Sequence, residues 1–205
     1  MSKRVLITGG RGDIAQAIRY KLEKEGYEVY APSRQEMDVT KWDSIERVIK
    51  QFVPDILINN AGYIVSRSIR EANLVDVKKH LDINLGGTFY CTAIGLKYNA
   101  NLQIINIASA AAVTSHATWS EYCASKAAVV MATKCWAEDG LYAVAISPGR
   151  TCTKMRKSLY PEEDQSTLLD PDDFAKIINK AIHKEYEPGT HLIVRKQNVQ
   201  ELLNG

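Results

Sequence analysis

Tyr122 and Lys126 are the residues of this chain whose types and spacing most directly suggest chemistry. They lie four positions apart in a segment of helical composition, so their side chains share one helix face, one turn apart. A free tyrosine, with a pKa of about 10, is a poor proton donor or acceptor at neutral pH. A lysine ammonium about 4 Å away would favour the phenolate by roughly 4 kcal/mol at an effective dielectric constant of about 20, and so lower that pKa. The pair therefore predicts proton transfer to or from a substrate oxygen.

The spacing alone proves little, because Tyr20 and Lys24 repeat it within the first predicted helix. Ser109 distinguishes the second pair. It lies thirteen residues before Tyr122 and directly after an apolar strand, at the edge of a parallel sheet where ligands bind. Its hydroxyl would hydrogen-bond the substrate oxygen and orient it toward Tyr122.

A glycine-rich turn near the N-terminus suggests a second kind of site. Gly9, Gly10 and Gly12 follow an apolar strand and precede a helix, which is the context that a dinucleotide turn needs. Glycine permits a positive φ and lets the backbone approach a pyrophosphate, whose charge then lies at the helix N-terminus. The alternative is a tight turn without a ligand.

Short apolar runs alternate with longer segments of helical period, which is typical of a parallel sheet wrapped by helices. The predicted strands are Arg4–Thr8, Glu28–Ala31, Asp55–Asn59, Gln103–Ile107, Ala143–Ser147 and His191–Val194. The predicted helices are Asp13–Glu25, Lys41–Phe52, Ile69–Asn99, Ser120–Ala137 and Pro171–Lys184, the third with a break near Asp82–Asn84. We therefore predict an α/β fold with a doubly wound parallel sheet of about six strands in a single domain.

Length and composition are those of one globular domain with a sizeable core. The chain has 205 residues, of which 45% are apolar and 24% charged. A formal charge of +2, without a run of lysine and arginine, argues against a dominant nucleic-acid surface. Cysteines lack close pairing, histidines lack metal-ligand spacing, and no apolar run reaches the roughly 18 residues that span a bilayer. We expect a cytoplasmic protein without a metal site or membrane segment.

The motifs occur in an order that resembles the short-chain dehydrogenase/reductase family. They are Thr8-Gly9-Gly10-Arg11-Gly12, Asn59-Asn60-Ala61-Gly62, Asn84, Ser109, Tyr122, Lys126 and Pro148-Gly149. The likeness extends from about Arg4 to Thr153. It implies a Rossmann fold and a nicotinamide-dependent oxidoreductase, which transfers hydride between the cofactor and a small carbonyl or alcohol substrate.

The resemblance also implies roles for individual residues. Asn84, Ser109, Tyr122 and Lys126 would form the catalytic group, with Tyr122 as general acid or base and Lys126 also bound to the nicotinamide ribose. Asn84 would anchor a water that leads protons to Lys126, although an asparagine at a helix break often only caps backbone groups. The implied cofactor contacts are Gly9, Arg11, Gly12, Asp13, Ile14, Ser33, Arg34, Asp38, Val39, Asn60, Ala61, Gly62, Tyr122, Lys126, Pro148, Gly149, Thr151 and Thr153.

The glycine turn departs from the family pattern at two positions. Asp13 and Ala15 stand where relatives have the second and third glycines. Alanine is small enough to keep the helix close to the strand. A carboxylate near a pyrophosphate is unfavourable unless it points away, so Asp13 is expected at the helix N-terminus, facing solvent.

The residues after the second strand favour NADP over NAD. NAD-selective sheets usually place an acidic residue there, which holds the ribose 2′-hydroxyl. This chain has Ser33 at that position and Arg34 beside it. A guanidinium suits a 2′-phosphate, and Arg11 could add a second positive contact. The other interpretation makes Arg34 a plain surface charge.

The same region is shorter than in relatives, because only three residues separate Arg34 from Asp38. We therefore predict that one edge strand and its helix are missing. The region also resembles the compact segment of deoxysugar reductases, so a sugar-nucleotide reductase or epimerase is an alternative. A non-catalytic NADP-binding redox sensor is another.

The substrate side is less defined by the sequence. Candidate pocket residues are Tyr63, Ile64, Ala110–Ala112, His116, Trp119, Arg150 and Met155. The polar segment 155–169 is expected to be mobile and to border the site, unless it is only a solvated connection. We expect a shallow pocket and a small substrate. The resemblance further suggests association through Leu85–Tyr98 and Ser120–Ala137, as a homodimer rather than a tetramer.

Overall fold

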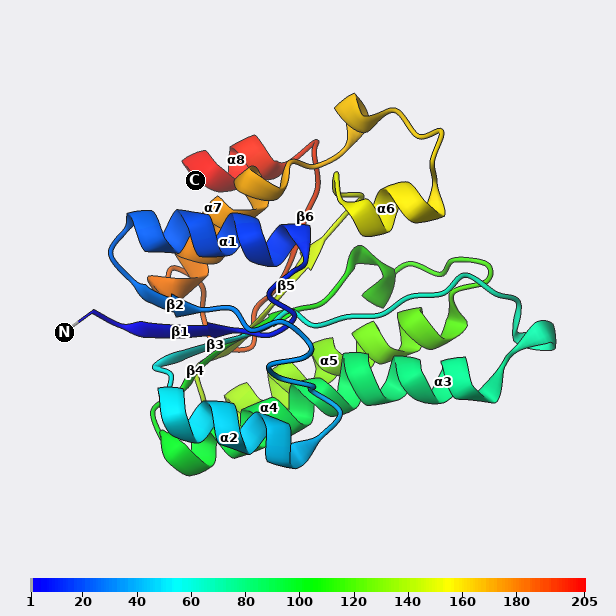
Figure 1. Ribbon diagram of the computed structural model, residues 1–205. Helices are drawn as coiled ribbons and strands as arrows, with labels where there is room; N and C mark the ends of the chain where they lie inside the picture. Colours follow the sequence, from blue (N-terminus) through cyan, green and yellow to red (C-terminus); the bar gives the residue numbers. More distant parts are fainter. Residues whose placement is uncertain (1) are drawn as a thin grey trace.

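Six apolar segments form one parallel sheet in the computed structural model, which describes residues 2–205 (Figure 1). The strands are β1 (Arg4–Ile7), β2 (Glu28–Tyr30), β3 (Ile56–Asn59), β4 (Gln103–Ile107), β5 (Ala143–Pro148) and β6 (His191–Val194). Their order is β2-β1-β3-β4-β5-β6, and every neighbouring pair is parallel. The predicted doubly wound sheet is confirmed.

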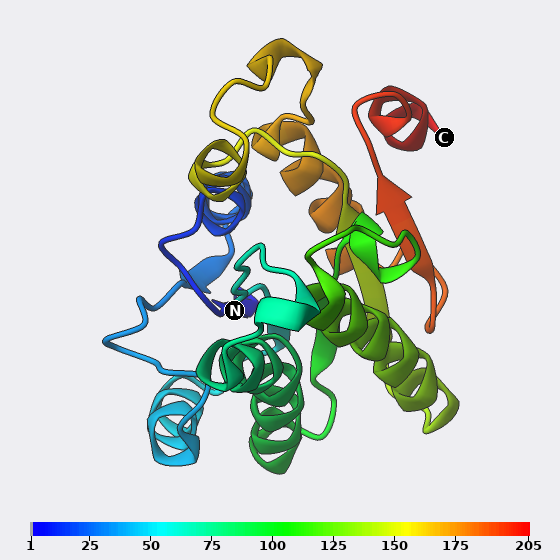
Figure 2. The ribbon, with the colours of Figure 1, turned by 90° about the vertical axis from the view of Figure 1, so that its right-hand side faces the viewer.

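Helices cover both faces of the sheet (Figures 1 and 2). They are α1 (Asp13–Lys24), α2 (Trp42–Phe52), α3 (Leu74–His80), α4 (Gly87–Tyr98), α5 (Ser120–Glu138), α6 (Lys154–Leu159), α7 (Pro171–Ile182) and α8 (Val199–Asn204). Helices α1, α7 and α8 lie on one face, and α2, α4 and α5 lie on the other. This arrangement buries the central strands β1, β3, β4 and β5 on both sides, which explains their largely apolar sequences.

Successive side chains of each strand enter opposite cores. Val5 and Ile7 of β1 pack in the core beneath α1 and α7, whereas Leu6 between them packs in the core beneath α2 and α4. Phe174 of α7 is fully buried in the first core. A shift of β1 by one residue relative to its neighbours would therefore turn each of these side chains toward the opposite core.

The edge of the sheet agrees with the short spacing in the sequence. The chain turns directly from β2 into α2, and in residues 2–205 no strand lies beyond β2. Strands β2 and β3 flank β1 on opposite sides, so the order of the strands along the sheet reverses at β1. A crevice opens at the carboxyl ends of the strands at such a switch point, where ligands bind in this kind of sheet.

The long helical segment 69–99 differs in detail from the prediction. A short 3₁₀ turn (Ile69–Glu71) comes first, and α3 begins only at Leu74, where the side chain of Asn73 caps the helix. The expected break is a π-helical turn, Leu81–Gly86, that joins α3 to α4 without interrupting the helix. Such turns accommodate one extra residue and are frequent at functional sites.

The C-terminal region holds more structure than predicted. The polar segment 155–169 lies partly in α6 and in a 3₁₀ turn, Gln165–Thr167. Helix α8 was not predicted, because Val199, Leu202 and Leu203 give only a short apolar pattern. These residues pack against the core under α7.

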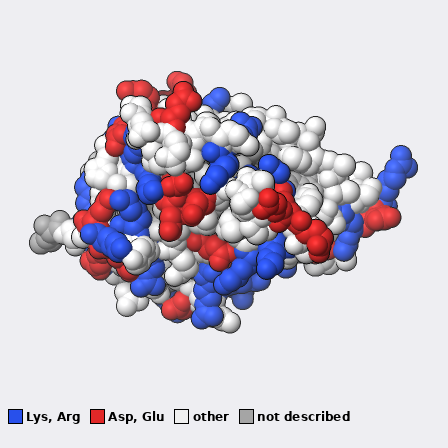
Figure 3. Space-filling view, turned by 90° about the horizontal axis from the view of Figure 1, so that it is seen from above, with Lys and Arg blue, Asp and Glu red and all other residues white. Residues whose placement is uncertain are grey.

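The surface seen from above carries both charges intermingled over much of its area (Figure 3), as the small net charge of +2 leads one to expect. Across the described chain, residues 2–205, no helix is long and apolar enough to cross a membrane.

Candidate active site

The glycine turn after β1 is shaped by close backbone approaches. Gly9 has φ +67°, and a Cβ atom placed on it would lie 2.9 Å from the Cα atom of Ala61. A Cβ on Gly10 would lie 2.0 Å from the carbonyl oxygen of Ala31. Both positions therefore require glycine, the first for its φ and both for space. Gly12 has φ −71° and ample room, so it leaves the start of α1 open.

A second loop, after β3, is fastened to this turn. The hydroxyl oxygen of Thr8 accepts hydrogen bonds from the backbone N–H groups of Asn60 and Ala61, both at 2.9 Å. The side-chain amide of Asn60 donates to the Thr8 carbonyl oxygen at 3.0 Å. The two motifs Thr8–Gly12 and Asn59–Gly62 thus form one rigid wall at the carboxyl edge of the sheet.

A cleft of about 410 Å³ runs from this wall to α5. Fifteen of the predicted cofactor contacts line it: Gly9, Arg11, Gly12, Asp13, Ile14, Arg34, Asp38, Val39, Asn60, Ala61, Gly62, Tyr122, Lys126, Pro148 and Thr153. Its volume lies within the range of roughly 300–1,000 Å³ that is usual for ligand pockets. The glycines that expose the backbone, and the lining residues that extend from the turn to α5, fit a dinucleotide.

Lys126 lies deep in this cleft, on the face of α5 that meets β4. Its side chain is buried, and its Nζ atom donates to the carbonyl oxygen of Ile107 at 2.9 Å. Burial lowers the pKa of Lys126 to about 8. The group therefore remains mostly protonated at neutral pH, although it loses its proton far more easily than an exposed lysine.

Tyr122 lies one turn earlier on α5, between the cleft and a smaller cavity. Burial raises the pKa of its phenol, and a hydrogen bond with the Ser109 hydroxyl offsets part of that effect. The Lys126 Nζ atom lies 6.0 Å from the centre of the Tyr122 ring. The expected lowering of the Tyr122 pKa by Lys126 is not found: the pKa is raised, and burial is the largest cause.

Ser109 stands where the sequence places it, just beyond β4. It begins the 3₁₀ turn Ala110–Ala112, and its hydroxyl oxygen accepts from the Ala111 N–H at 3.2 Å. Its hydroxyl faces the same cavity as Tyr122. The strand end therefore delivers a second hydroxyl group to the place where the phenol lies.

Asn84 lies in the π-helical turn and is fully buried. Its side chain pairs with the backbone of Tyr63, accepting from the N–H at 2.7 Å and donating to the carbonyl oxygen at 2.9 Å. It also donates to the hydroxyl of Ser125 at 3.1 Å. A Cβ on Gly62 would lie 3.7 Å from Asn84 Oδ1 and 3.9 Å from Lys126 Nζ, so the two groups converge there.

The smaller cavity has a volume of about 150 Å³ and adjoins the cleft at Tyr122. Most of the residues predicted for a substrate pocket line it, namely Ile64, Ala110, Ala111, His116, Trp119, Arg150 and Met155, together with Ser109. The ring of Trp119 lies edge-on to Tyr122, with centroids 5.8 Å apart. Tyr63 lines the larger cleft instead.

These motifs belong to a known family. The family model of short chain dehydrogenases matches residues 34–164. The chain belongs to the short-chain dehydrogenase family. It is similar to a 3-oxoacyl-[acyl-carrier-protein] reductase of Thermotoga maritima, with 28% identity covering 86% of this chain and 88% of that protein.

Solved structures of similar fold extend over the whole chain. A small-chain dehydrogenase in complex with NADPH is 23% identical, with a TM-score of 0.84 and complete coverage of both chains. A 4-hydroxyisoleucine dehydrogenase complexed with NADH is also 23% identical, with a TM-score of 0.82 and coverage of 94% and 96%. At this identity the likeness shows the short-chain dehydrogenase fold.

Three predicted cofactor contacts lie outside the main cleft of this family member. Ser33 is buried, and its backbone N–H donates to Oε2 of Glu36 at 2.7 Å. Gly149 and Thr151 line the smaller cavity instead, and Thr151 is held by its own hydroxyl bond to the Gly149 carbonyl oxygen at 3.0 Å. Arg34 does line the cleft, with 68% of its side chain exposed and its Nε atom 3.6 Å from Asp38 Oδ2.

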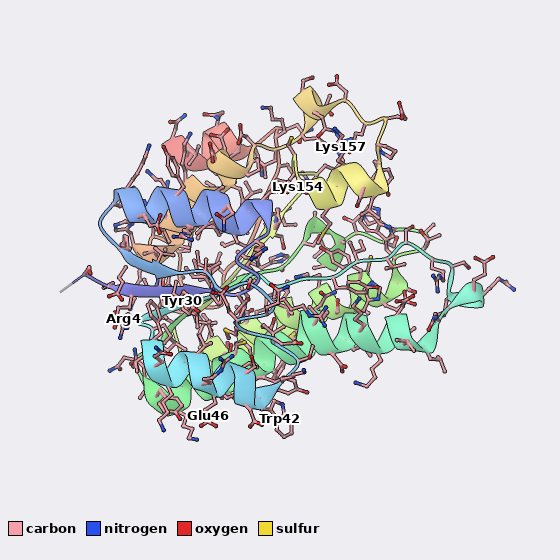
Figure 4. The ribbon with its side chains drawn as sticks, in the orientation of Figure 1. Arg4, Tyr30, Trp42, Glu46, Lys154 and Lys157 are labelled. Carbon is pink, nitrogen blue, oxygen red and sulfur yellow. The ribbon has the colours of Figure 1, made fainter. Side chains whose placement is uncertain are left out.

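Asp13 does not face solvent as expected. Its carboxylate accepts a hydrogen bond from the backbone N–H of Lys154 at 2.6 Å, and the ammonium of Lys154 lies 3.8 Å away. Figure 4 shows Lys154 at the beginning of α6, close to the beginning of α1. The carboxylate is thus tolerated in the turn because a donor from a distant segment satisfies it.

Several residues that line the cleft were not predicted from the sequence. They include Met37, Lys79, Ile83 and Lys154. Met37 could have been found, since it directly precedes the predicted contacts Asp38 and Val39. The ammonium of Lys79 lies 3.9 Å above the ring of Tyr63, a contact that depends on the position of α3 and not on any local motif.

Proposed function

We propose that this short-chain dehydrogenase is an NADP(H)-dependent reductase of small carbonyl compounds. The observation that supports it most strongly is the position of Tyr122, which lines both the long cleft and the smaller cavity that contains Ser109. A dinucleotide in the cleft and a carbonyl compound in the cavity would meet at this phenol.

The residues present suit proton transfer during carbonyl reduction. A bound reduced nicotinamide would supply a hydride to the carbonyl carbon and would itself be oxidised. Tyr122, whose raised pKa keeps it protonated at neutral pH, would give its proton to the carbonyl oxygen, and Ser109 would hold that oxygen. The product is the alcohol, and the ammonium of Lys126 would stabilise the phenolate until solvent restores the proton.

The neighbourhood of β2 supports NADP as the preferred cofactor. Arg11 and Arg34 line the cleft at that end, and no acidic side chain occupies the position of Ser33. Guanidinium groups bind phosphate with paired, charge-assisted hydrogen bonds. Structural neighbours include complexes with NADPH and with NADH, so the preference must be measured for this chain.

A titration followed by nicotinamide fluorescence tests the cofactor. We expect NADPH to bind roughly tenfold to a hundredfold more tightly than NADH, the effect of one or two charged hydrogen bonds. Arg34→Gln should remove most of this difference, whereas Arg70→Gln, on the exposed turn before α3, should leave it unchanged. Equal affinity for both nucleotides would contradict the assignment of Arg34.

The alternatives have less support. A sugar-nucleotide enzyme of the extended branch needs room for a nucleotide substrate beside Tyr122, and the cavity there has a volume of about 150 Å³. A non-catalytic sensor would need neither Ser109 nor Tyr122. Carbonyl turnover that disappears in Tyr122→Phe distinguishes an enzyme from a sensor.

We also propose that two copies associate through α4 and α5. Phe89 on α4 and Met131 on α5 are 42% and 61% exposed, and the ring of Phe89 lies 5.2 Å from that of Trp136 on α5, so both helices present apolar side chains that a partner could cover. Light scattering should give the mass of a dimer, and Met131→Glu should shift it toward the monomer. A monomeric wild-type protein would overturn this proposal.

A further inference from the structure

The cavity beside Tyr122 has largely apolar walls. Aliphatic and aromatic side chains predominate among the residues that line it with Tyr122, and they include Ile64, Trp119, Met155 and Leu159. Trp119 is largely buried, and its ring lies 4.9 Å from that of His116. Such walls favour an apolar or aromatic group of the ligand.

Two arginines are the cationic residues that line this cavity in the described chain, and one carboxylate engages both. Glu163 Oε2 lies 2.6 Å from Arg156 Nε, and Oε1 lies 2.8 Å from Arg156 Nη2. The same Oε1 lies 3.1 Å from Nη1 of Arg150. The hydrogen bond from Arg156, and the charges of both arginines, hold the pKa of Glu163 below its ordinary value, so the carboxylate is ionised near neutral pH.

The Arg156 pair is enclosed, which makes it stronger than an ordinary surface ion pair. The side chains of Arg156 and Glu163 are 16% and 15% exposed. The guanidinium of Arg156 also lies 3.9 Å above the ring of Tyr160. Both of its paired nitrogens are thereby committed to Glu163, and a ligand carboxylate would have to displace an existing bidentate contact.

Arg150 is held less completely. It makes a single contact with Glu163, and 53% of its side chain is exposed, so solvent screens its charge. Of the two arginines, it is therefore the one that would become available to an anionic ligand if Glu163 lost its charge.

We propose that this cavity selects a small, uncharged carbonyl compound bearing an aromatic or alkyl group, and that Glu163 sets this selectivity by holding Arg150 and Arg156. A cavity of about 150 Å³ with apolar walls can hold a benzene-sized ring. Glu163 acts here as a positioning residue, since it does not itself line the cavity and acts through the two arginines that do. The reaction rests on the function proposed above: the ketone becomes an alcohol as the reduced nicotinamide nucleotide is oxidised and one proton is taken up.

A pair of ligands that differ only in charge tests the selectivity. Methyl phenylglyoxylate is neutral, and phenylglyoxylate carries the same aryl ketone beside a carboxylate. Dissociation constants come from NMR titration of the nucleotide-free protein, and kcat/KM from oxidation of NADPH or NADH. Binding thus tests the cavity, whether or not turnover occurs.

We expect the wild-type protein to bind the ester more tightly than the acid, and Glu163→Gln to shift that ratio toward the acid by roughly tenfold to a hundredfold, the effect of freeing charged hydrogen-bond donors. Glu162→Gln removes the same charge from the adjacent, exposed position and should leave the ratio unchanged. Adding Arg150→Gln to Glu163→Gln should reverse most of the gain. Arg150→Gln alone is the second test, because it keeps the Arg156–Glu163 pair and should keep the preference for the ester.

Equal binding of acid and ester by the wild-type protein would overturn the proposal, as would an unchanged ratio in a folded Glu163→Gln variant. Binding of the ester without any oxidation of nucleotide would support the cavity assignment and refute the reductase function. Turnover of the acid in preference to the ester would support the reductase function and refute the selectivity proposed for the cavity.

Discussion

Two tyrosine–lysine pairs with the same spacing lie on two helices of this molecule, and only one of them lies in a site. On α1, Tyr20 is 57% exposed, and the ammonium of Lys24 lies 4.1 Å above its ring. On α5, Lys126 is 4% exposed and donates to a strand carbonyl, while Tyr122 lines a cleft and a cavity. The first pair is a surface cation–π contact.

The difference lies in what each helix face meets. A spacing of four residues ensures that the two side chains share a face, but it does not say whether that face meets solvent or a strand end. Tyr122 faces the carboxyl edge of β4, where Ser109 also lies, because α5 packs directly beside β4 and β5. Helix α1 approaches the same edge only with its first residues, among them Asp13 and Ile14.

The largest difference is expected between the variants that remove the hydroxyl groups of Tyr122 and Tyr20. Tyr122→Phe should lower kcat/KM for carbonyl reduction by roughly 10²–10⁴, the usual contribution of a positioned general acid. Tyr20→Phe removes the same hydroxyl from α1 and should change activity less than twofold, or about 0.4 kcal/mol. Comparable losses in both variants, measured with NADPH and a small aryl ketone, would break the distinction between the pairs.

Substitution of the two lysines should likewise affect activity on α5 and leave it unchanged on α1. Lys126→Met removes the buried ammonium and should lower kcat/KM by roughly tenfold to a hundredfold, the effect of one charged hydrogen bond. Binding of NADPH should weaken as well, which fluorescence titration would show. Lys24→Met is the matched control on α1, and it should reproduce the wild-type values.

The pH dependence sharpens the contrast, because Lys126 has a pKa of about 8. Tyr122 stays protonated above that pH, since burial raises its pKa. The ammonium of Lys126 is lost as pH rises through about 8, so the rate of carbonyl reduction should be constant below this pH and fall by up to about tenfold per unit above it. A profile measured from pH 6 to 10 that stays flat would show that the charge of Lys126 is not required.

The smallest effect is expected at the start of α1. Asp13→Asn keeps an oxygen acceptor for the Lys154 N–H but loses the charge, so the free energy of unfolding should fall by about 1 kcal/mol. Urea denaturation measures this change. Asp43→Asn makes the same change in the first turn of α2, where the carboxylate is exposed, and serves as the control for the loss of charge. An Asp13→Asn variant as stable as the wild-type protein would show that this contact contributes little.

Much of the fold followed from local patterns in the sequence. Apolar strands and glycine turns identify the sheet, because a buried parallel strand needs an uninterrupted run such as Ile56–Asn59. The short spacing after Arg34 also revealed the absent edge strand. Helix α8 was missed, since six residues give too few turns for a period to appear.

The site was predictable where a motif is local, and less so where it depends on distant contacts. The turn at Gly9 needs glycine for its own φ, so the sequence reveals it. The partner of Asp13 lies 141 residues away, at Lys154. The ion pairs of Glu163 depend on how the segment after β5 folds back. Neither contact has a local signature, and the first contradicts the expectation that Asp13 faces solvent.

The π-helical turn Leu81–Gly86 has a consequence for insertions and deletions in this chain. Without one of its residues, α3 and α4 would join as a regular α-helix, and the residues on either side would rotate by about 100° relative to each other. Asn84 would then leave the backbone of Tyr63, and either α3 or α4 would turn its packed face away from its neighbours. The helix is one residue longer here than a regular α-helix would be, so the position of Asn84 depends on the length of this segment as well as on its side chains.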